Sequence, residues 1–125
     1  MRRVVDGMNV IGSRPDGWWR DRTGAMRRLA EELDRLATRT GDTVTLVLDG
    51  RPREVGAPDA VEVVFAPGGP NAADDEIARR VAADADPGSL VVTTSDHDLV
   101  RRVTEAGGRV EGSGSLRRQL DELSP

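Results

Sequence analysis

The stretch TVTLVL at residues 43–48 restricts the fold more than any other part of the chain. A strand that exposes one face to solvent alternates apolar residues with charged or strongly polar ones, and this stretch contains no charge. Its apolar and β-branched side chains instead suit a strand that is covered on both faces. Such strands occur almost only in parallel sheets with helices on either side, so the stretch predicts an α/β fold.

The remaining apolar patterns alternate between strand and helix. Short apolar runs that end at Gly, Pro or Asp predict strands, and apolar residues three or four positions apart predict helices. The predicted strands cover 3–5, 43–48, 61–65, 90–94 and 109–110. The predicted helices have their apolar residues within 26–37, 72–83, 99–103 and 116–123, and the segments 12–22 and 50–59 are predicted loops. This order predicts a doubly wound parallel sheet of about five strands.

The composition favours one domain without disulfides. A length of 125 residues suits a single domain with a real core, which we expect to span residues 1–125. With no cysteine and one histidine, the chain has no disulfide or thiolate metal site, and zinc is a poor candidate. No run approaches 18 apolar residues, and Asp6 and Asn9 interrupt the apolar N-terminal stretch. We therefore expect no membrane span and no signal peptide, and a cytoplasmic location.

Aspartates follow the predicted strands at the edge where a parallel sheet places its chemistry. They are Asp6 and Asp49 at the ends of the first two strands, Asp74 and Asp75 after the third, and Asp96 and Asp98 after the fourth. The carboxyl ends of parallel strands meet at one edge of the sheet, so these side chains are expected to converge. Carboxylates crowded together repel one another, and we expect a hard divalent cation, Mg²⁺ or Mn²⁺, to bind between them.

Each acid also has a purely structural explanation when it is considered alone. The Asp-Gly pairs at 6–7 and 49–50 have the composition of turns. The acids at 74–76 suit the first turn of a helix, where the helix dipole favours negative charge. Ser95 or Asp96 suits a helix N-cap. The cation site is therefore predicted from the joint pattern and not from any single residue.

Two further polar residues near these acids have alternative roles. Asn9, three residues after Asp6, is placed either to hold a water, a phosphate oxygen or a neighbouring carboxylate, or to fix its own loop by an Asx turn. His97 follows Asp96 directly and is a candidate proton donor to a leaving group. An exposed histidine in a first helical turn is more often idle, and we expect His97 to be idle.

Arginine and tryptophan gather in the predicted loops. The formal net charge is −4, yet residues 14–28 contain five Arg against two acids. Loop arginines beside an acidic site suit the binding of substrate phosphates. The candidates are Arg14, Arg20, Arg22, Arg51 and Arg53. The adjacent Trp18 and Trp19 are expected to pack together as a pair. The alternative is that one anchors the loop to the core and the other stacks on an unpaired base, and Trp18 is included among the candidate substrate-binding residues.

Five motifs together resemble a known family. They are VVDGMNVIG at 4–12, TLVLDG at 45–50, VVFAPGGPNAADDEI at 63–77, TTSDHDLV at 93–100 and GGRVEGSGSLRRQL at 107–120. In this order they resemble the NYN domain of the YacP type, within the PIN-like nuclease superfamily. The resemblance covers nearly the whole chain. It implies a PIN-like fold with α/β/α layers and a central parallel sheet of order 3-2-1-4-5.

The resemblance also implies an activity and a site. The activity is that of a metal-dependent endoribonuclease, and the family's acidic site would fall on Asp6, Asp74 and Asp96. Asn9 and Asp49 would complete the catalytic group. The extra acids Asp75 and Asp98 are expected to join the metal ligands. Some members of this type cut mRNA in association with the ribosome, so RNA and a ribosome are the implied partners.

The sequence thus predicts hydrolysis of RNA phosphodiester bonds, with single-stranded RNA as the expected substrate and Mg²⁺ or Mn²⁺ as cofactor. The alternative is a catalytically inactive NYN-fold module that binds RNA or protein, which ion pairs between the acids and nearby arginines would favour. A phosphatase of another doubly wound type is disfavoured, because DGMN stands where an Asp-x-Asp nucleophile motif would be needed. The chain also contains no GxGxxG motif and no Walker loop, which disfavours dinucleotide and NTP binding.

Overall fold

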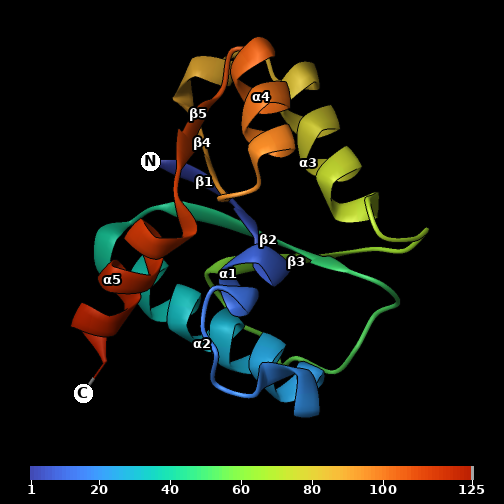
Figure 1. Ribbon diagram of the computed structural model, residues 1–125. Helices are drawn as coiled ribbons and strands as arrows, with labels where there is room; N and C mark the ends of the chain where they lie inside the picture. The colour runs from blue at the N-terminus through green and yellow to red at the C-terminus, as the bar shows by residue number, and fades with distance from the viewer. Residues whose placement is uncertain (125) are drawn as a thin grey trace.

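Five parallel strands form one sheet in the order β3-β2-β1-β4-β5 in the computed structural model, which describes residues 1–124 (Figure 1). The strands are β1 (Arg2–Asp6), β2 (Thr43–Asp49), β3 (Val61–Ala66), β4 (Leu90–Thr93) and β5 (Arg109–Glu111). Both the predicted α/β class and the predicted strand order 3-2-1-4-5 are confirmed.

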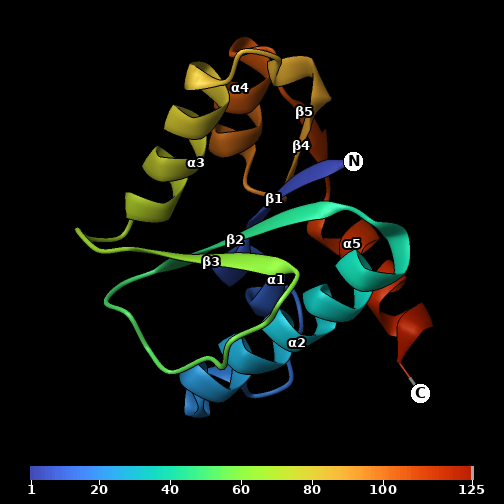
Figure 2. The ribbon, with the colours of Figure 1, turned by 180° about the vertical axis from the view of Figure 1, so that it is seen from behind.

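Helices cover both faces of the sheet (Figures 1 and 2). The helices are α1 (Gly7–Gly12), α2 (Arg22–Thr40), α3 (Ala72–Ala83), α4 (His97–Glu105) and α5 (Ser113–Leu123), with short 3₁₀ turns η1 (Trp18–Arg20) and η2 (Pro87–Ser89). The helices α1, α2 and α5 share one hydrophobic core with the sheet, and α3 and α4 share a second core with its other face. The chain therefore has the expected three layers.

Strand β2 is buried on both faces, as its composition predicted. Leu46 and Leu48 belong to the core under α2, whereas Val47 belongs to the core under α3 and α4. All three side chains are 0% exposed. Burying an aliphatic side chain of this size contributes about 1.5–3 kcal/mol of transfer free energy, so β2 supports both layers.

Helix α1 is the main element that the apolar pattern did not predict. A helix of six residues is too short to show a clear period, and Asp6-Gly7 had the composition of a turn. The structure instead passes from β1 directly into α1. A Cβ on Gly7 would lie 2.5 Å from Leu48 Cδ2 and 2.9 Å from the carbonyl oxygen of Val47, so glycine lets α1 pack closely against β2.

The connections place most loops where they were predicted. Helix α3 covers the predicted 72–83, and β3 extends one residue beyond the predicted 61–65. The connection from β2 to β3 is a loop at 50–60, in which Val55 is buried against the core under α2 (Figure 2). Within the described part of the chain, residues 1–124, no helix is long and apolar enough to cross a membrane.

Candidate active site

Four aspartates gather at the carboxyl edge of the sheet and form what we call the acidic cluster. Asp6 ends β1, Asp49 ends β2, Asp74 lies in the first turn of α3 and Asp96 is the N-cap of α4. Parallel pairing of β1 with both β2 and β4 places the ends of these strands side by side. The topology therefore brings together acids that are up to 90 positions apart in the sequence.

Hydrogen bonds orient three of these carboxylates. The Thr94 hydroxyl donates to Asp6 Oδ2 at 2.8 Å. The backbone N–H of Ala73 donates to Asp49 Oδ1 at 3.2 Å, and that of Leu99 donates to Asp96 Oδ1 at 2.9 Å. Each carboxylate is thus fixed by a group at the start of a neighbouring loop or helix. Carboxylates held in one orientation suit a binding site, because their geometry is set before anything binds.

The cluster is electrostatically strained. Asp6 is 5% exposed, and burial raises the pKa of its carboxyl to about 6, with the nearby charges of Asp74 and Asp49 adding to the effect and the Thr94 hydroxyl opposing it. Burial also raises the pKa of Asp74, again with support from Asp96 and Asp49. In the ion pairs of residues 1–124, no arginine pairs with any acid of the cluster. Arg102 lowers the pKa of Asp74 from nearby without pairing with it, so no carboxylate of the cluster has an ion-pair partner in this part of the chain.

The donor set fits a hard divalent cation. Carboxylate oxygens suit Mg²⁺ and Mn²⁺, and a cation would favour the ionised form of Asp6 against the burial and the neighbouring negative charges that raise its pKa. Across residues 1–124, no three His or acidic side chains are grouped tightly enough to enclose an ion between them. Mg²⁺ commonly keeps several waters and binds through one or two carboxylates together with substrate phosphates. The cluster therefore suits a hydrated ion that a phosphate helps to hold, and not an all-protein cage.

Asn9 ties three segments of the site together. Its side-chain oxygen accepts from the backbone N–H of Ser95 at 2.9 Å and from the Ser113 hydroxyl at 2.6 Å. The Ser95 hydroxyl in turn accepts from the backbone N–H of Ser113 at 3.0 Å. The Asn9 oxygen therefore fixes the β4–α4 loop and the start of α5 against α1, and does not form a local Asx turn. This role positions Asp96 indirectly.

Thr94 is a site residue that the sequence reading did not single out. It is 1% exposed, and its oxygen accepts from the backbone N–H of Asp96 at 3.1 Å while its hydroxyl donates to Asp6. One side chain thus links the ends of β1 and β4 to the start of α4. The available signal was the run of small hydroxyl residues at 93–95, directly before the predicted Asp96.

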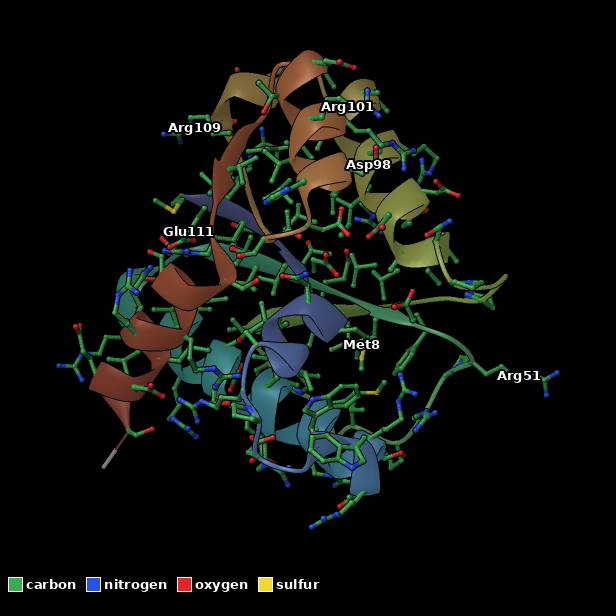
Figure 3. All side chains as sticks on the ribbon, in the orientation of Figure 1. Met8, Arg51, Asp98, Arg101, Arg109 and Glu111 are labelled. Carbon is green, nitrogen blue, oxygen red and sulfur yellow. The ribbon has the colours of Figure 1, made fainter. Side chains whose placement is uncertain are left out.

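The two extra acids lie at different distances from the cluster. Asp75 contributes to the raised pKa of Asp74, but its carboxylate accepts from Arg102 at 3.0 Å. Asp98 is exposed and accepts from Arg101 at 2.7 Å on α4 (Figure 3). The structure therefore keeps Asp75 at the rim and does not bring Asp98 into the cluster. His97 is exposed at the first residue of α4.

The candidate phosphate-binding arginines divide between two regions. Arg51 is exposed on the 50–60 loop and extends away from the body of the protein (Figure 3), and Arg53 donates to the Thr23 hydroxyl at 3.2 Å. Arg20 and Arg22 lie beside the two tryptophans of η1. Arg14 instead forms an ion pair with Asp121 of α5 and faces away from the cluster. These contacts hold Arg20, Arg22 and Arg53 near the first turn of α2.

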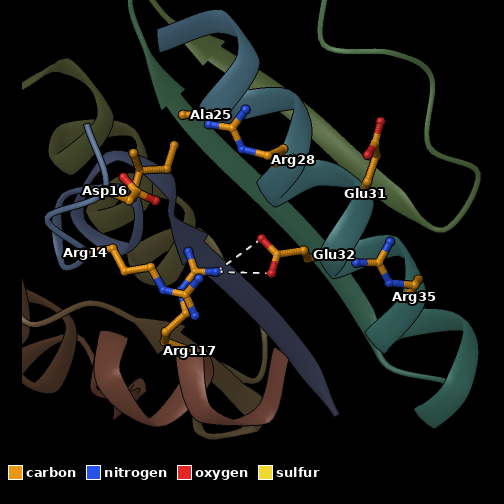
Figure 4. A pocket seen from close by; sticks show the side chains of 9 residues that line it. Arg14, Asp16, Ala25, Arg28, Glu31, Glu32, Arg35 and Arg117 are labelled. Atoms are coloured by element: carbon orange, nitrogen blue, oxygen red, sulfur yellow. Dashed lines mark hydrogen bonds and ion pairs between the residues drawn. The ribbon is translucent and has the colours of Figure 1, made fainter. Parts of the chain in front are cut away.

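A separate pocket lies between α1, α2 and α5 (Figure 4). Side chains of both charges line it, including Arg14 and Arg117, and the Arg117 guanidinium donates to both oxygens of Glu32 at 3.1 Å. No residue of the acidic cluster lines this pocket. Arg14 therefore belongs to this mixed-charge surface and not to the acidic cluster.

The sequence is similar to those of known proteins. The model of the YacP-like NYN domain family matches residues 3–124. A UPF0178 protein of Xanthomonas oryzae pv. oryzae is 41% identical over 99 residues, which is 79% of this chain and 58% of that protein. A UPF0178 protein of Xanthomonas campestris pv. campestris is 43% identical over 89 residues, which is 71% of this chain and 52% of that protein. The chain thus spans little more than half the length of these relatives.

Solved structures have the same fold. The crystal structure of Rae1 (YacP) from Bacillus subtilis superposes with a TM-score of 0.80 at 22% identity, over 98% of this chain and 75% of that chain. The W164L mutant of the same protein superposes with a TM-score of 0.76 at 23% identity, over 98% of this chain and 76% of that chain.

Proposed function

Because the chain belongs to the YacP-like NYN domain family, whose fold is of the nuclease type, we propose that it is a metal-dependent endoribonuclease. The substrate is single-stranded RNA, the reaction is hydrolysis of an internal phosphodiester bond, and the cofactor is Mg²⁺ or Mn²⁺. Asp6, Asp74 and Asp96 surround a hydrated metal ion, one or two of them as direct ligands and the rest through its waters, with Asp75 at the rim. Asp49 and Asn9 complete the site, Asp49 as a fourth carboxylate and Asn9 as a positioning residue.

One observation carries the proposal: the buried Asp6 lies among three other carboxylates with no arginine paired to any of them in residues 1–124. Nuclease chemistry accounts for such an arrangement, because a bound divalent cation both neutralises the acids and activates water. Ion pairs within the cluster would favour the inactive binding module. Of the six candidate acids, only Asp75 and Asp98 form ion pairs with arginine within residues 1–124, and both lie outside the four central acids, so the enzyme is better supported than the inactive module.

Residues in and around the acidic cluster have different roles in the proposed reaction. A divalent ion, when bound, lowers the pKa of a coordinated water and neutralises charge on the attacked phosphate. Thr94 holds the Asp6 carboxylate in one orientation, and the N–H of Leu99 does the same for Asp96. Arg102 lies close enough to lower the pKa of Asp74 and is therefore placed to contact a phosphate at the rim.

The proposal is tested with RNA labelled at either end. Purified protein is incubated with single-stranded RNA in Mn²⁺, in Mg²⁺ and in EDTA, beside Asp6→Asn and Asp96→Asn. The matched control is Asp86→Asn, which removes one exposed carboxylate before β4, at the opposite edge of the sheet. We expect internal cuts with either metal, none in EDTA, loss in the two cluster variants and normal cutting by the control. Equal degradation by wild type and Asp6→Asn would refute the proposal.

A narrower form of the proposal concerns the substrate. The YacP-like NYN family is RNA-associated, and we propose that the RNA is mRNA, engaged on a ribosome. Cleavage of an mRNA engaged on ribosomes, compared with cleavage of the naked mRNA of the same sequence, tests this form. Cutting of both RNAs at the same sites and rates would remove the ribosome from the proposal and leave the nuclease in place.

A further inference from the structure

The side chain of Trp19 is 55% exposed on η1, while its neighbour Trp18 is only partly exposed and packs against the core under α2. Among residues 1–124 the only other large hydrophobic side chain with comparable exposure is Met1, at the chain end. The structure thus separates the two predicted roles of the tryptophans. Trp18, which was predicted to bind substrate, anchors the loop, and Trp19 presents its ring to solvent.

The exposed ring is held in a fixed orientation. The ring centroids of Trp18 and Trp19 lie 5.9 Å apart with an interplanar angle of 86°, an edge-to-face contact. The turn beneath them is closed by a hydrogen bond from the Arg20 N–H to the Gly17 carbonyl at 3.0 Å. Gly17 has a φ of +80°, a conformation that favours glycine. A rigid ring loses little conformational entropy when a ligand stacks on it.

One guanidinium lies over each of the two tryptophan rings. The Arg20 guanidinium lies 5.8 Å from the Trp19 centroid, and that of Arg22 lies 5.4 Å from the Trp18 centroid, both in the range of cation–π contacts. The two acids of the segment are engaged with backbone groups: Asp16 accepts from the Trp18 N–H, and Asp21 caps α2 through the Gly24 N–H. The surface thus combines an aromatic ring with arginine.

This Trp–Arg surface, which consists of Trp19, Arg20 and Arg22, lies at the same edge of the sheet as the acidic cluster. Helix α2 begins beside it and runs back to the start of β2, so the first turn of α2 is at the carboxyl edge. Helix α1 connects the two places. It begins next to Asp6, its six residues span about 9 Å, and the ring of Trp18 lies near its last residue.

A ligand that matches this surface carries flat aromatic groups and negative charges along one chain. Single-stranded nucleic acid has both, because its bases are free to stack and its phosphates attract arginine. A duplex presents phosphates but keeps its bases paired. Helix α1 lies between the acidic cluster and the Trp–Arg surface. A single strand could therefore run from the cluster to this surface.

We propose that Trp19, supported by Arg20, is a base-stacking subsite for an unpaired nucleotide of the RNA substrate, a few nucleotides from the bond that is cut. The inference rests on the proposed function for the identity of the substrate as RNA. It attributes the enzyme's preference for single-stranded RNA to the side chain of Trp19. Trp19, and not the predicted Trp18, is thus the stacking residue.

Binding is measured without cleavage. Wild type, Trp19→Ala, Trp19→Phe and Arg109→Ala are titrated in EDTA against a fluorescent single-stranded RNA and against the duplex of the same sequence. Arg109→Ala is the control, because Arg109 is exposed on the edge strand β5 (Figure 3). We expect Trp19→Ala to weaken single-strand binding roughly tenfold, Trp19→Phe to weaken it much less, and duplex binding to stay unchanged.

A second measurement locates the contact. RNAs with one abasic nucleotide at successive positions are bound to wild type and to Trp19→Ala, whose folding is checked by its urea midpoint. One position should weaken wild-type binding and have no effect on the variant. The inference is overturned if Trp19→Ala binds single strands as tightly as wild type does, or if its affinities for single strand and duplex fall equally. It is also overturned if wild type binds no RNA.

The result is separable from the nuclease proposal. Binding that depends on Trp19, together with no cleavage in Mn²⁺, supports the subsite and refutes the catalysis. Cleavage that depends on Asp6, together with binding that is independent of Trp19, refutes the subsite and leaves the nuclease.

Discussion

Replacing Asp6 by asparagine is expected to stabilise the folded protein at neutral pH while it abolishes the proposed catalysis. Asp6 is 5% exposed, and burial raises the pKa of its carboxyl from 3.8 to about 6. A shift of one pKa unit corresponds to about 1.4 kcal/mol, so ionised Asp6 lowers folding stability by up to about 3 kcal/mol. Asparagine has the same shape without the charge, and its oxygen still accepts the hydrogen bond from Thr94.

The pH dependence follows from the direction of this shift. The pKa of Asp6 is higher in the folded state than in the unfolded state, so the folded protein binds the proton more tightly. The contribution of Asp6 to the stability of the wild type therefore falls as pH rises from about 4 to about 6, and this loss is complete above about pH 7. Asp6→Asn lacks this titration. After allowance for an imperfectly paired amide, we expect it to gain about 1–2 kcal/mol at pH 7.5 and nothing at pH 4.

Urea unfolding, followed by tryptophan fluorescence in EDTA at pH 7.5 and pH 4, measures this difference. The gain at pH 7.5 corresponds to a rise in Tm of about 4–8 °C for a domain of this size. Asp86→Asn serves as the control, because Asp86 is exposed at the other edge of the sheet. If Asp6→Asn is less stable than wild type at pH 7.5, or if its stability difference from wild type is the same at both pH values, the reasoning about Asp6 is refuted.

Three further predictions follow from the same geometry. Thr94→Val removes the hydroxyl that links Asp6 to the N–H of Asp96. It is expected to lower the free energy of unfolding by about 1–3 kcal/mol at pH 7.5. Urea titrations measure this change, and an unchanged urea midpoint would contradict the prediction. Gly7→Ala places a Cβ 2.5 Å from Leu48 Cδ2 and is expected to cost about 1–3 kcal/mol, seen as a lower Tm; an equal or higher Tm would show that α1 has room to shift. Mn²⁺ should raise the Tm of wild type at pH 7.5, less so at pH 5 where Asp6 is largely protonated, and should not raise that of Asp6→Asn; an equal rise in both proteins would place the ion elsewhere.

The sequence predicted the fold through its strongest patterns and missed its shortest element. The run at 43–48 required burial on both faces, and β2 is buried on both faces. The apolar period at 72–83 predicted α3 with the observed bounds. Helix α1 has only six residues, so close packing of Gly7 against β2 determines it, and that contact depends on residues 40 positions away.

The site was predictable only where topology decides it. Asp6 and Asp49 end parallel strands, and the carboxyl ends of parallel strands lie at one edge of the sheet. Their convergence therefore followed from the alternation of strands and helices alone. Asp98 follows Asp96 by two residues on a helix, and residues two apart do not face the same side, so its pairing with Arg101 is a consequence of helix geometry.

The hydrogen bonds that support the site could not be predicted from the sequence. The oxygen of Asn9 accepts from Ser113, which lies 104 positions away, and Thr94 reaches Asp6 across 88 positions. Such contacts depend on where the whole sheet places α5 and the β4–α4 loop. Arg14 illustrates the same limit, because its ion pair with Asp121 depends on the docking of α5 beside α1.

The central claim is that the acidic cluster holds a divalent ion together with a substrate phosphate, and binding of Mn²⁺ tests it most directly. Free Mn²⁺ is measured by electron paramagnetic resonance at pH 7.5 with a non-cleavable single-stranded RNA present. Wild type and Asp86→Asn should each remove Mn²⁺ from solution, and Asp6→Asn and Asp74→Asn should not. Equal uptake of Mn²⁺ by all four proteins, or no uptake by wild type, would contradict the account.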